Sequence, residues 1–252
     1  MELNLKNKNA IITGGASGFG KQLAIDLAKE GANIIIADIS IENAKKVSEE
    51  LISKYNVKSF AIKTDLSNHD DTINLIKESE TKFSNLDILV NNAGFWPTNN
   101  VVDTPVEEWI KTFDINLTSV FLTCREFAKH VLNRNGKGKI LNITSQAAFN
   151  GSTTGHAHYA ASKSGVVTFT ISLSREIARM GVNVNAMAIG MMNSPMTKKA
   201  IEKNGEYYIN RIPIGKIAEP SDLTPMAVFL VSDASNYYTG ATFDVSGGMI
   251  TR

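Results

Sequence analysis

The chain has 252 residues, of which 43% are hydrophobic and 20% are charged, and its formal net charge is +1. This is an ordinary globular composition, and the near-neutral charge gives no reason to expect nucleic acid or an anionic membrane as a partner. The single cysteine, Cys124, excludes an intrachain disulfide and a Cys-x-x-Cys metal site. Because no stretch resembles a signal peptide or a membrane span, we expect a cytoplasmic protein.

Short apolar runs alternate with helical patterns along the whole chain. The predicted strands are residues 10–13, 34–37, 59–63, 88–91, 139–143, 182–188 and 242–245. The predicted helices are residues 18–29, 41–54, 71–83, 106–133, 158–180 and 221–232. Continuous apolar strands that alternate with helices are typical of α/β proteins, so we predict one domain, residues 1–252, with a doubly wound, seven-stranded parallel sheet and helices on both faces. The irregular segment 190–220 is predicted to be a short helical lid.

The turn after the first predicted strand is rich in glycine. Residues 13–20 read TGGASGFG, and glycines allow the tight turn that brings backbone N–H groups to a phosphate at the start of a helix. The same turn also matches most of a nucleotide-triphosphatase P-loop, G-x-x-x-x-G-K, ending at Lys21. Gln22 follows where that motif needs Ser or Thr to bind magnesium, so the sequence favours a dinucleotide site.

Asp38 ends the second predicted strand, about 20 positions after the glycine turn. A carboxylate there suits a hydrogen bond to the ribose 2′-OH of NAD and repels the 2′-phosphate of NADP. Ala16, Ser17 and Ile39 offer no cation to hold that phosphate. The sequence therefore predicts that NAD(H) is preferred over NADP(H), with a capping or loop role for Asp38 as the alternative.

Tyr159 and Lys163 lie four residues apart in a predicted helix and so share a face. An ammonium beside a phenol favours the phenolate, which lowers the pKa of the tyrosine from about 10 toward the working pH. Such a phenol can exchange a proton with an alcohol or a carbonyl. A surface pair without chemistry is the alternative, so the remaining motifs decide the interpretation.

The motifs together resemble the short-chain dehydrogenase/reductase family. After the glycine turn come, in the family's order, Asp65-Leu66, the NNAG segment ending at Gly94, Asn116 in DINLT, Ser145 ending LNITS, and Tyr159 with Lys163. The resemblance covers essentially the whole chain. It implies a Rossmann-type fold and an NAD(H)-dependent oxidoreductase that interconverts a secondary alcohol and a ketone by hydride transfer.

The resemblance also implies the site residues. Tyr159 is the general acid for carbonyl reduction and the general base for alcohol oxidation, and Lys163 lowers its pKa and binds the nicotinamide ribose. Ser145 donates to the substrate oxygen, and Asn116 holds a water that connects Lys163 to solvent. The implied cofactor-binding residues are Gly14, Ser17, Gly18, Phe19, Gly20, Asp38, Ile39, Asp65, Leu66, Asn92, Ala93, Gly94, Ile143, Tyr159, Lys163, Gly190, Met192 and Ser194.

Two positions depart from the family pattern. Ile189 stands where the family has proline, and Ser194 stands where it has threonine, although serine keeps a hydroxyl. No metal site is expected, since four histidines and one cysteine form no recognisable ligand motif. His156 and His158 are expected to be solvated residues at the start of the active-site helix.

The expected partner is a small-molecule alcohol or ketone, and the apolar lid favours an apolar substrate slightly. One alternative function is an NADPH-dependent 3-oxoacyl-thioester (acyl-carrier-protein) reductase. Another is a non-catalytic NAD(H)-binding regulatory protein on the same fold. The long apolar faces of residues 106–133 and 158–180, read with the resemblance, imply a homotetramer.

Overall fold

The computed structural model describes residues 1–152 and 155–250. Its centre is a seven-stranded sheet in which every neighbouring pair is parallel, with the strand order β3-β2-β1-β4-β5-β6-β7. The strands are β1 (Asn9–Thr13), β2 (Asn33–Asp38), β3 (Ser59–Lys63), β4 (Ile88–Asn91), β5 (Gly138–Ser145), β6 (Val182–Ile189) and β7 (Thr242–Val245). This sheet confirms the predicted single-domain, Rossmann-type architecture.

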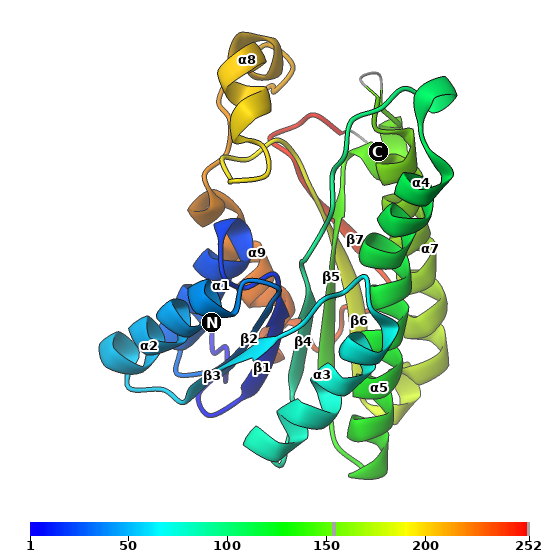
Figure 1. Ribbon diagram of the computed structural model, residues 1–252. Coiled ribbons are helices and arrows are strands. Elements are labelled where there is room, and N and C mark those ends of the chain that lie inside the picture. Colours follow the sequence, from blue (N-terminus) through cyan, green and yellow to red (C-terminus); the bar gives the residue numbers. More distant parts are fainter. Residues whose placement is uncertain (153–154, 251–252) are drawn as a thin grey trace.

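Helices cover both faces of the sheet (Figure 1). On one face lie α1 (Gly18–Lys29), α2 (Ile41–Tyr55) and α9 (Pro220–Leu230). The other face is covered by α3 (His69–Lys82), α5 (Ser119–Asn133) and α7 (Ala157–Ile177). The remaining helices lie toward the carboxyl ends of the strands: α4 (Val106–Phe113), the short α6 (Ala147–Asn150) and α8 (Lys198–Ile209). In the described residues no helix is long and apolar enough to cross a membrane.

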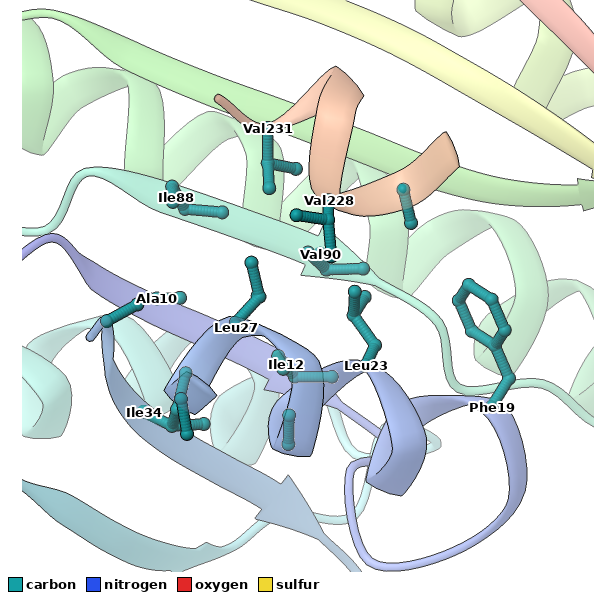
Figure 2. Close-up of a cluster of buried hydrophobic side chains, with 14 of the residues drawn as sticks. Ala10, Ile12, Phe19, Leu23, Leu27, Ile34, Ile88, Val90, Val228 and Val231 are labelled. Carbon is teal, nitrogen blue, oxygen red and sulfur yellow. The ribbon is translucent and has the colours of Figure 1, made fainter. Parts of the chain in front are cut away.

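The continuous apolar strands fill two cores because neighbouring side chains point to opposite faces. In β1, Ile12 packs into the core beneath α1 and α9, whereas Ile11 packs into the core beneath α3 and α5. Figure 2 shows the first core, in which Leu23 and Leu27 of α1 meet Val228 of α9. The sequence of each strand therefore serves both layers at once, which is why these runs show no polar alternation.

The strand order reverses between β1 and β4, so the chain leaves the carboxyl ends of these neighbours in opposite directions. The crevice outside such a switch point is the usual ligand site of open α/β sheets. The glycine turn follows β1 here, and the NNAG segment begins in β4 (Ile88–Asn91) and continues just after it. The fold thus brings together two motifs that are far apart in the sequence.

The helices differ in detail from the prediction. The predicted helix 106–133 contains a π-helical turn, Asp114–Thr118, between α4 and α5. The helix predicted at 71–83 begins at His69, because the Asn68 side chain accepts hydrogen bonds from the backbone N–H groups of Asp70 and Asp71. The predicted lid contains α8, a helix without buried residues that departs from helical geometry at Asn204.

Candidate active site

The glycine turn and the start of α1 form the first wall of a cavity of about 330 Å³. Gly18, the first residue of α1, has φ +51°, a left-handed value that side chains disfavour. Its N-cap residue, Ser17, makes no side-chain capping bond, so this side chain supplies no acceptor for the first N–H groups of the helix. An uncapped helix N-terminus beside a cavity fits a pyrophosphate.

Most of the residues expected to bind the cofactor line this one cavity. They are Gly14, Ser17, Gly18, Phe19, Asp38, Ile39, Asp65, Leu66, Asn92, Ala93, Gly94, Ile143, Tyr159, Lys163, Met192 and Ser194. The cavity runs from the end of β2, across the switch point, to the first two turns of α7, which suits an extended dinucleotide. The lining residues therefore fit a nicotinamide dinucleotide.

Two of the expected residues, Gly20 and Gly190, do not line this cavity. A Cβ on Gly20 would lie 2.3 Å from the Gly14 carbonyl oxygen, so this glycine permits the close packing of α1 against the turn. Gly190 lines a second cavity, and a Cβ there would lie 2.9 Å from Cα of Ser246. Both are glycines for reasons of packing.

Some residues on the cavity wall were not named from the sequence. Thr64 follows β3 and Thr144 precedes the last residue of β5, and both line the cavity. Their position at the carboxyl ends of parallel strands was the signal that could have found them. Ile115 belongs to the π-helical turn, for which strand periodicity gives no such guide.

Asp38 holds the turn that surrounds it. One carboxylate oxygen accepts a hydrogen bond from the Ala16 backbone N–H at 3.1 Å, and the other accepts from the Ser40 N–H at 2.9 Å. Ser40 is the N-cap residue of α2. The acid therefore has a structural task at this position, whichever dinucleotide binds.

Tyr159 lies in the first turn of α7 and lines both the cofactor cavity and a second cavity of about 200 Å³. It is hydrogen bonded to Ser145, the last residue of β5. Desolvation of the phenol raises its pKa, and the Ser145 hydrogen bond opposes that rise. The prediction of a lowered pKa is therefore wrong for the protein groups alone, because burial favours the neutral phenol.

Lys163 lies one turn further along α7 and is buried. Its Nζ donates to the Ile143 carbonyl oxygen at 2.9 Å and lies 5.9 Å from the centroid of the Tyr159 ring. Burial lowers the pKa of Lys163 from 10.5 to about 8. The site thus holds a phenol and an amine on one helix face, as predicted, with both pKa values moved toward the neutral forms.

Asn116 belongs to the π-helical turn and is fully buried. Its Oδ1 accepts from the Phe95 N–H at 2.7 Å, and its Nδ2 donates to the Phe95 carbonyl and to the Ser162 hydroxyl. These contacts engage both N–H donors and one acceptor site of the side chain. Asn116 locks the segment after β4 against α7 and is a positioning residue.

His156 and His158 are both buried, so the prediction of solvated residues is wrong. The His156 ring stacks on Trp96 with centroids 4.3 Å apart, and its Nδ1 lies 2.7 Å from the Pro97 carbonyl oxygen. His158 Nε2 lies 3.1 Å from a Glu108 carboxylate oxygen. Packing against α4 and the loop after β4 thus withdraws both rings from water.

The P-loop alternative fails on the position of its lysine. Lys21 Nζ forms an ion pair with Glu50 of α2 at 3.0 Å, and Lys21 does not line the cavity. A P-loop lysine must reach the nucleotide phosphates. The turn is therefore better suited to a dinucleotide than to a magnesium-bound triphosphate.

Ile189 and Ser194 mark the two departures from the family pattern. Ile189 remains the last residue of β6, in register with Val245, and lines both cavities. The Ser194 hydroxyl lies 2.9 Å from the Thr197 hydroxyl and shares its hydrogen bond. The serine keeps its place on the cofactor wall while it also fixes the turn before α8.

Comparison with known proteins agrees with this geometry. A family model described as enoyl-(acyl carrier protein) reductase matches residues 14–250. A 3-oxoacyl-[acyl-carrier-protein] reductase of Staphylococcus aureus is 37% identical over 243 residues, which cover 96% of this chain and 98% of the relative. The chain belongs to the short-chain dehydrogenase/reductase family. It is an oxidoreductase of that family that acts on a CH–OH group with NAD(P).

Solved structures extend the comparison to the cofactor. A protein of Beutenbergia cavernae, named as an NAD(P) dependent gluconate 5-dehydrogenase, has NADP bound; it has a TM-score of 0.92 and 31% identity, covering 97% of each chain. A 3-ketoacyl-(acyl-carrier-protein) reductase of Brucella melitensis, complexed with NADH, has a TM-score of 0.89 and 30% identity, covering 98% of this chain and 99% of that one.

The predicted preference for NAD(H) over NADP(H) is contradicted by these relatives. The structural neighbour from Beutenbergia cavernae has NADP bound, and the Staphylococcus aureus relative is named as an acyl-carrier-protein reductase. The physical reason is visible at Asp38, whose two carboxylate oxygens bind the backbone of Ala16 and Ser40. An acidic residue at this position is explained by the turn and does not by itself select the cofactor.

Proposed function

We propose that this oxidoreductase interconverts a secondary alcohol and a ketone, with Tyr159 as the general acid and base. The observation that carries the proposal is the position of Tyr159 between the two cavities, hydrogen bonded to Ser145. A reacting carbon in the second cavity then lies next to the hydroxyl groups of Ser145 and Tyr159, and next to the cofactor cavity. This is the arrangement that hydride and proton transfer require.

The nicotinamide cofactor, when bound, supplies or accepts the hydride. The protein's task is to hold the substrate oxygen and to move one proton. Ser145 donates a hydrogen bond to that oxygen, and Tyr159 gives the proton in reduction and takes it in oxidation. Lys163, with Nζ beside the tyrosine ring, supplies positive charge and a donor to the ribose. Asn116 keeps the loop after β4 in place.

The test replaces Ser145, whose hydroxyl also accepts a hydrogen bond from the Ala147 N–H at 3.1 Å. Ser145→Ala is expected to lower kcat by about 10²–10³-fold, the usual cost of one lost donor to a developing oxyanion. Ser145→Thr, which keeps a hydroxyl, should recover most of it. The readout is nicotinamide absorbance with a panel of ketones and alcohols. An alanine variant as fast as the wild type would remove Ser145 from the mechanism.

A second and finer candidate is reduction of a 3-oxoacyl thioester with NADPH. It is supported by the relatives named as acyl-carrier-protein reductases and by the lining of the second cavity. Apolar and aromatic side chains in that lining, among them Trp96, Met191, Met196, Tyr208 and Met249, suit an acyl chain. Polar side chains such as Gln146, Asn150 and Thr197 also line it, so a keto-sugar acid is the alternative substrate. Comparing kcat/KM for an acetoacetyl thioester with that for a keto-sugar acid decides between them.

We also propose the surroundings of the reaction. Segment 190–220 acts as the lid over the substrate, because several of its side chains line the second cavity.

The protein acts as a homotetramer in the cytoplasm; exposed apolar side chains such as Trp109, Phe121 and Tyr238 support contacts between copies. Sedimentation at several concentrations tests the assembly.

Cys124 is buried, and burial raises the pKa of its thiol to about 12, which suits an inert structural role.

A further inference from the structure

The substrate side of the site continues past the second cavity into a larger one of about 750 Å³. Five residues line both cavities, and they form the neck between them: Trp96, His156, Met196, Tyr207 and Tyr208. The inner cavity contains Ser145 and Tyr159, whereas the outer cavity lies along α8. Figure 1 shows α8 standing beyond the carboxyl ends of the strands, away from the sheet.

The charged side chains along this path are all cationic. Arg211 lines the inner cavity, and Lys199 and Lys203 line the outer one. No carboxylate of a residue within 1–152 or 155–250 lines either cavity. The whole chain carries nearly equal numbers of basic and acidic residues, 26 and 25, so this local excess is not a reflection of composition. A cavity lined by one sign of charge attracts ligands of the other sign.

The positions of Lys199 and Lys203 reduce the stability of α8. Lys199 and Lys203 are four residues apart, so they share a helix face and repel each other. Lys198, on the neighbouring face, lies 3.9 Å from Glu202, but no carboxylate in the described parts of the chain lies within ion-pair distance of Lys199 or Lys203. An anionic ligand in the outer cavity would supply the missing counter-charge.

His156 belongs to the neck, and Arg211 lines the inner cavity beside it. The Arg211 guanidinium lies over the Tyr207 ring at 5.1 Å and donates to its hydroxyl, which keeps the cation beside the opening. Burial lowers the pKa of His156, so this ring adds no positive charge at neutral pH. The neck is therefore mainly aromatic and apolar. Arg211 lies on its inner side, and Lys199 and Lys203 line the outer cavity beyond it.

We propose that the substrate carries an anionic group, a phosphate or a carboxylate, separated from its carbonyl by an extended arm. The carbonyl lies at Tyr159, the arm passes the aromatic neck, and the anion binds Lys199 and Lys203 of α8. This inference rests on the proposed function only for the position of the carbonyl. Lys199 and Lys203 are then specificity-determining residues.

The test uses two thioesters that differ by one phosphate: acetoacetyl-phosphopantetheine and acetoacetyl-pantetheine. The wild type is expected to show a KM for the phosphorylated compound about tenfold below that for its neutral partner, a preference that shrinks in high salt. The double variant Lys199→Gln/Lys203→Gln should raise only the first KM, by about tenfold. Lys198→Gln is the matched control on the same helix and should change neither. A ketone with a terminal carboxylate, set against its methyl ester, distinguishes a carboxylate from a phosphate.

Direct binding separates this inference from the proposed reaction. With saturating NADP⁺, quenching of Trp96 fluorescence in a Trp109→Phe background gives the Kd of each compound whether or not it reacts. Tighter binding of the phosphorylated or carboxylated member, lost in the double variant, supports the anion site even if no turnover occurs. Equal affinity for charged and neutral members, or an equal loss for both in the double variant, overturns it.

Discussion

Lys163→Met is expected to make the protein more stable at neutral pH while it removes activity. The lysine is buried, and burial lowers its pKa from 10.5 to about 8, so the folded state resists its charge. At ~1.36 kcal/mol per pKa unit, that fall corresponds to a penalty of ~3 kcal/mol at pH 7. Methionine avoids the penalty but leaves the Ile143 carbonyl without its 2.9 Å donor, a loss of ~1–3 kcal/mol.

The sign of the pH dependence follows from the direction of the shift. A cation whose pKa is lowered on folding destabilises the folded state below that pKa, and the penalty fades as pH rises from 8 toward 10.5. The free energy of unfolding of the wild type should therefore rise by ~2 kcal/mol relative to that of the variant between pH 7 and pH 9.5. Lys163→Met should therefore be more stable than the wild type by ~1–2 kcal/mol at pH 7 and no more stable than it at pH 9.5.

The assay is urea unfolding of both proteins at the two pH values without added dinucleotide. Lys45→Met is the control, because Lys45 is exposed and pairs with Glu42 on the helix surface. Its effect should stay within ~0.5 kcal/mol at both pH values. If Lys163→Met is less stable than the wild type at pH 7, and the difference does not change with pH, then burial does not suppress the charge of this lysine and the reasoning is wrong.

Two further predictions concern catalysis and the turn. Ketone reduction should slow as pH rises above about 8, because Lys163 then loses the charge that supports Tyr159; a pH profile of kcat/KM with an unchanged rate up to pH 10 would contradict this role. Gly20→Ala should destabilise the fold by ~2 kcal/mol or more, because its Cβ would lie 2.3 Å from the Gly14 oxygen, whereas Gly205→Ala in α8 meets nothing within 4 Å and should stabilise by ~0.5–1 kcal/mol. Urea midpoints compare the pair, and equal effects would refute the packing argument.

Much of the fold follows from periodicity. Continuous runs such as Ile34–Ile36 are apolar at every position, and such runs indicate strands covered on both faces. The π-helical turn around Asn116 was not predictable, because the side chain that holds it bonds to Phe95, which is 21 residues away. Local pattern cannot show a contact of that kind.

The site was predicted in part for the same reason. Motif order brought Ser145, Tyr159 and Lys163 together correctly, since each follows or faces the carboxyl end of a strand. The direction of the Tyr159 pKa was wrong because an i,i+4 rule counts the nearby charge and omits burial. The cofactor preference was wrong because the backbone partners of Asp38 are visible only in the folded turn.

The central claim is that Tyr159 transfers the proton. The most direct test is single-turnover ketone reduction by Tyr159→Phe with prebound cofactor, together with the Kd for that cofactor. The expected rate is about 10²–10⁴-fold lower, with cofactor affinity changed less than about twofold, since phenylalanine keeps the ring and removes only the hydroxyl. A rate within tenfold of the wild type at equal cofactor occupancy would contradict it.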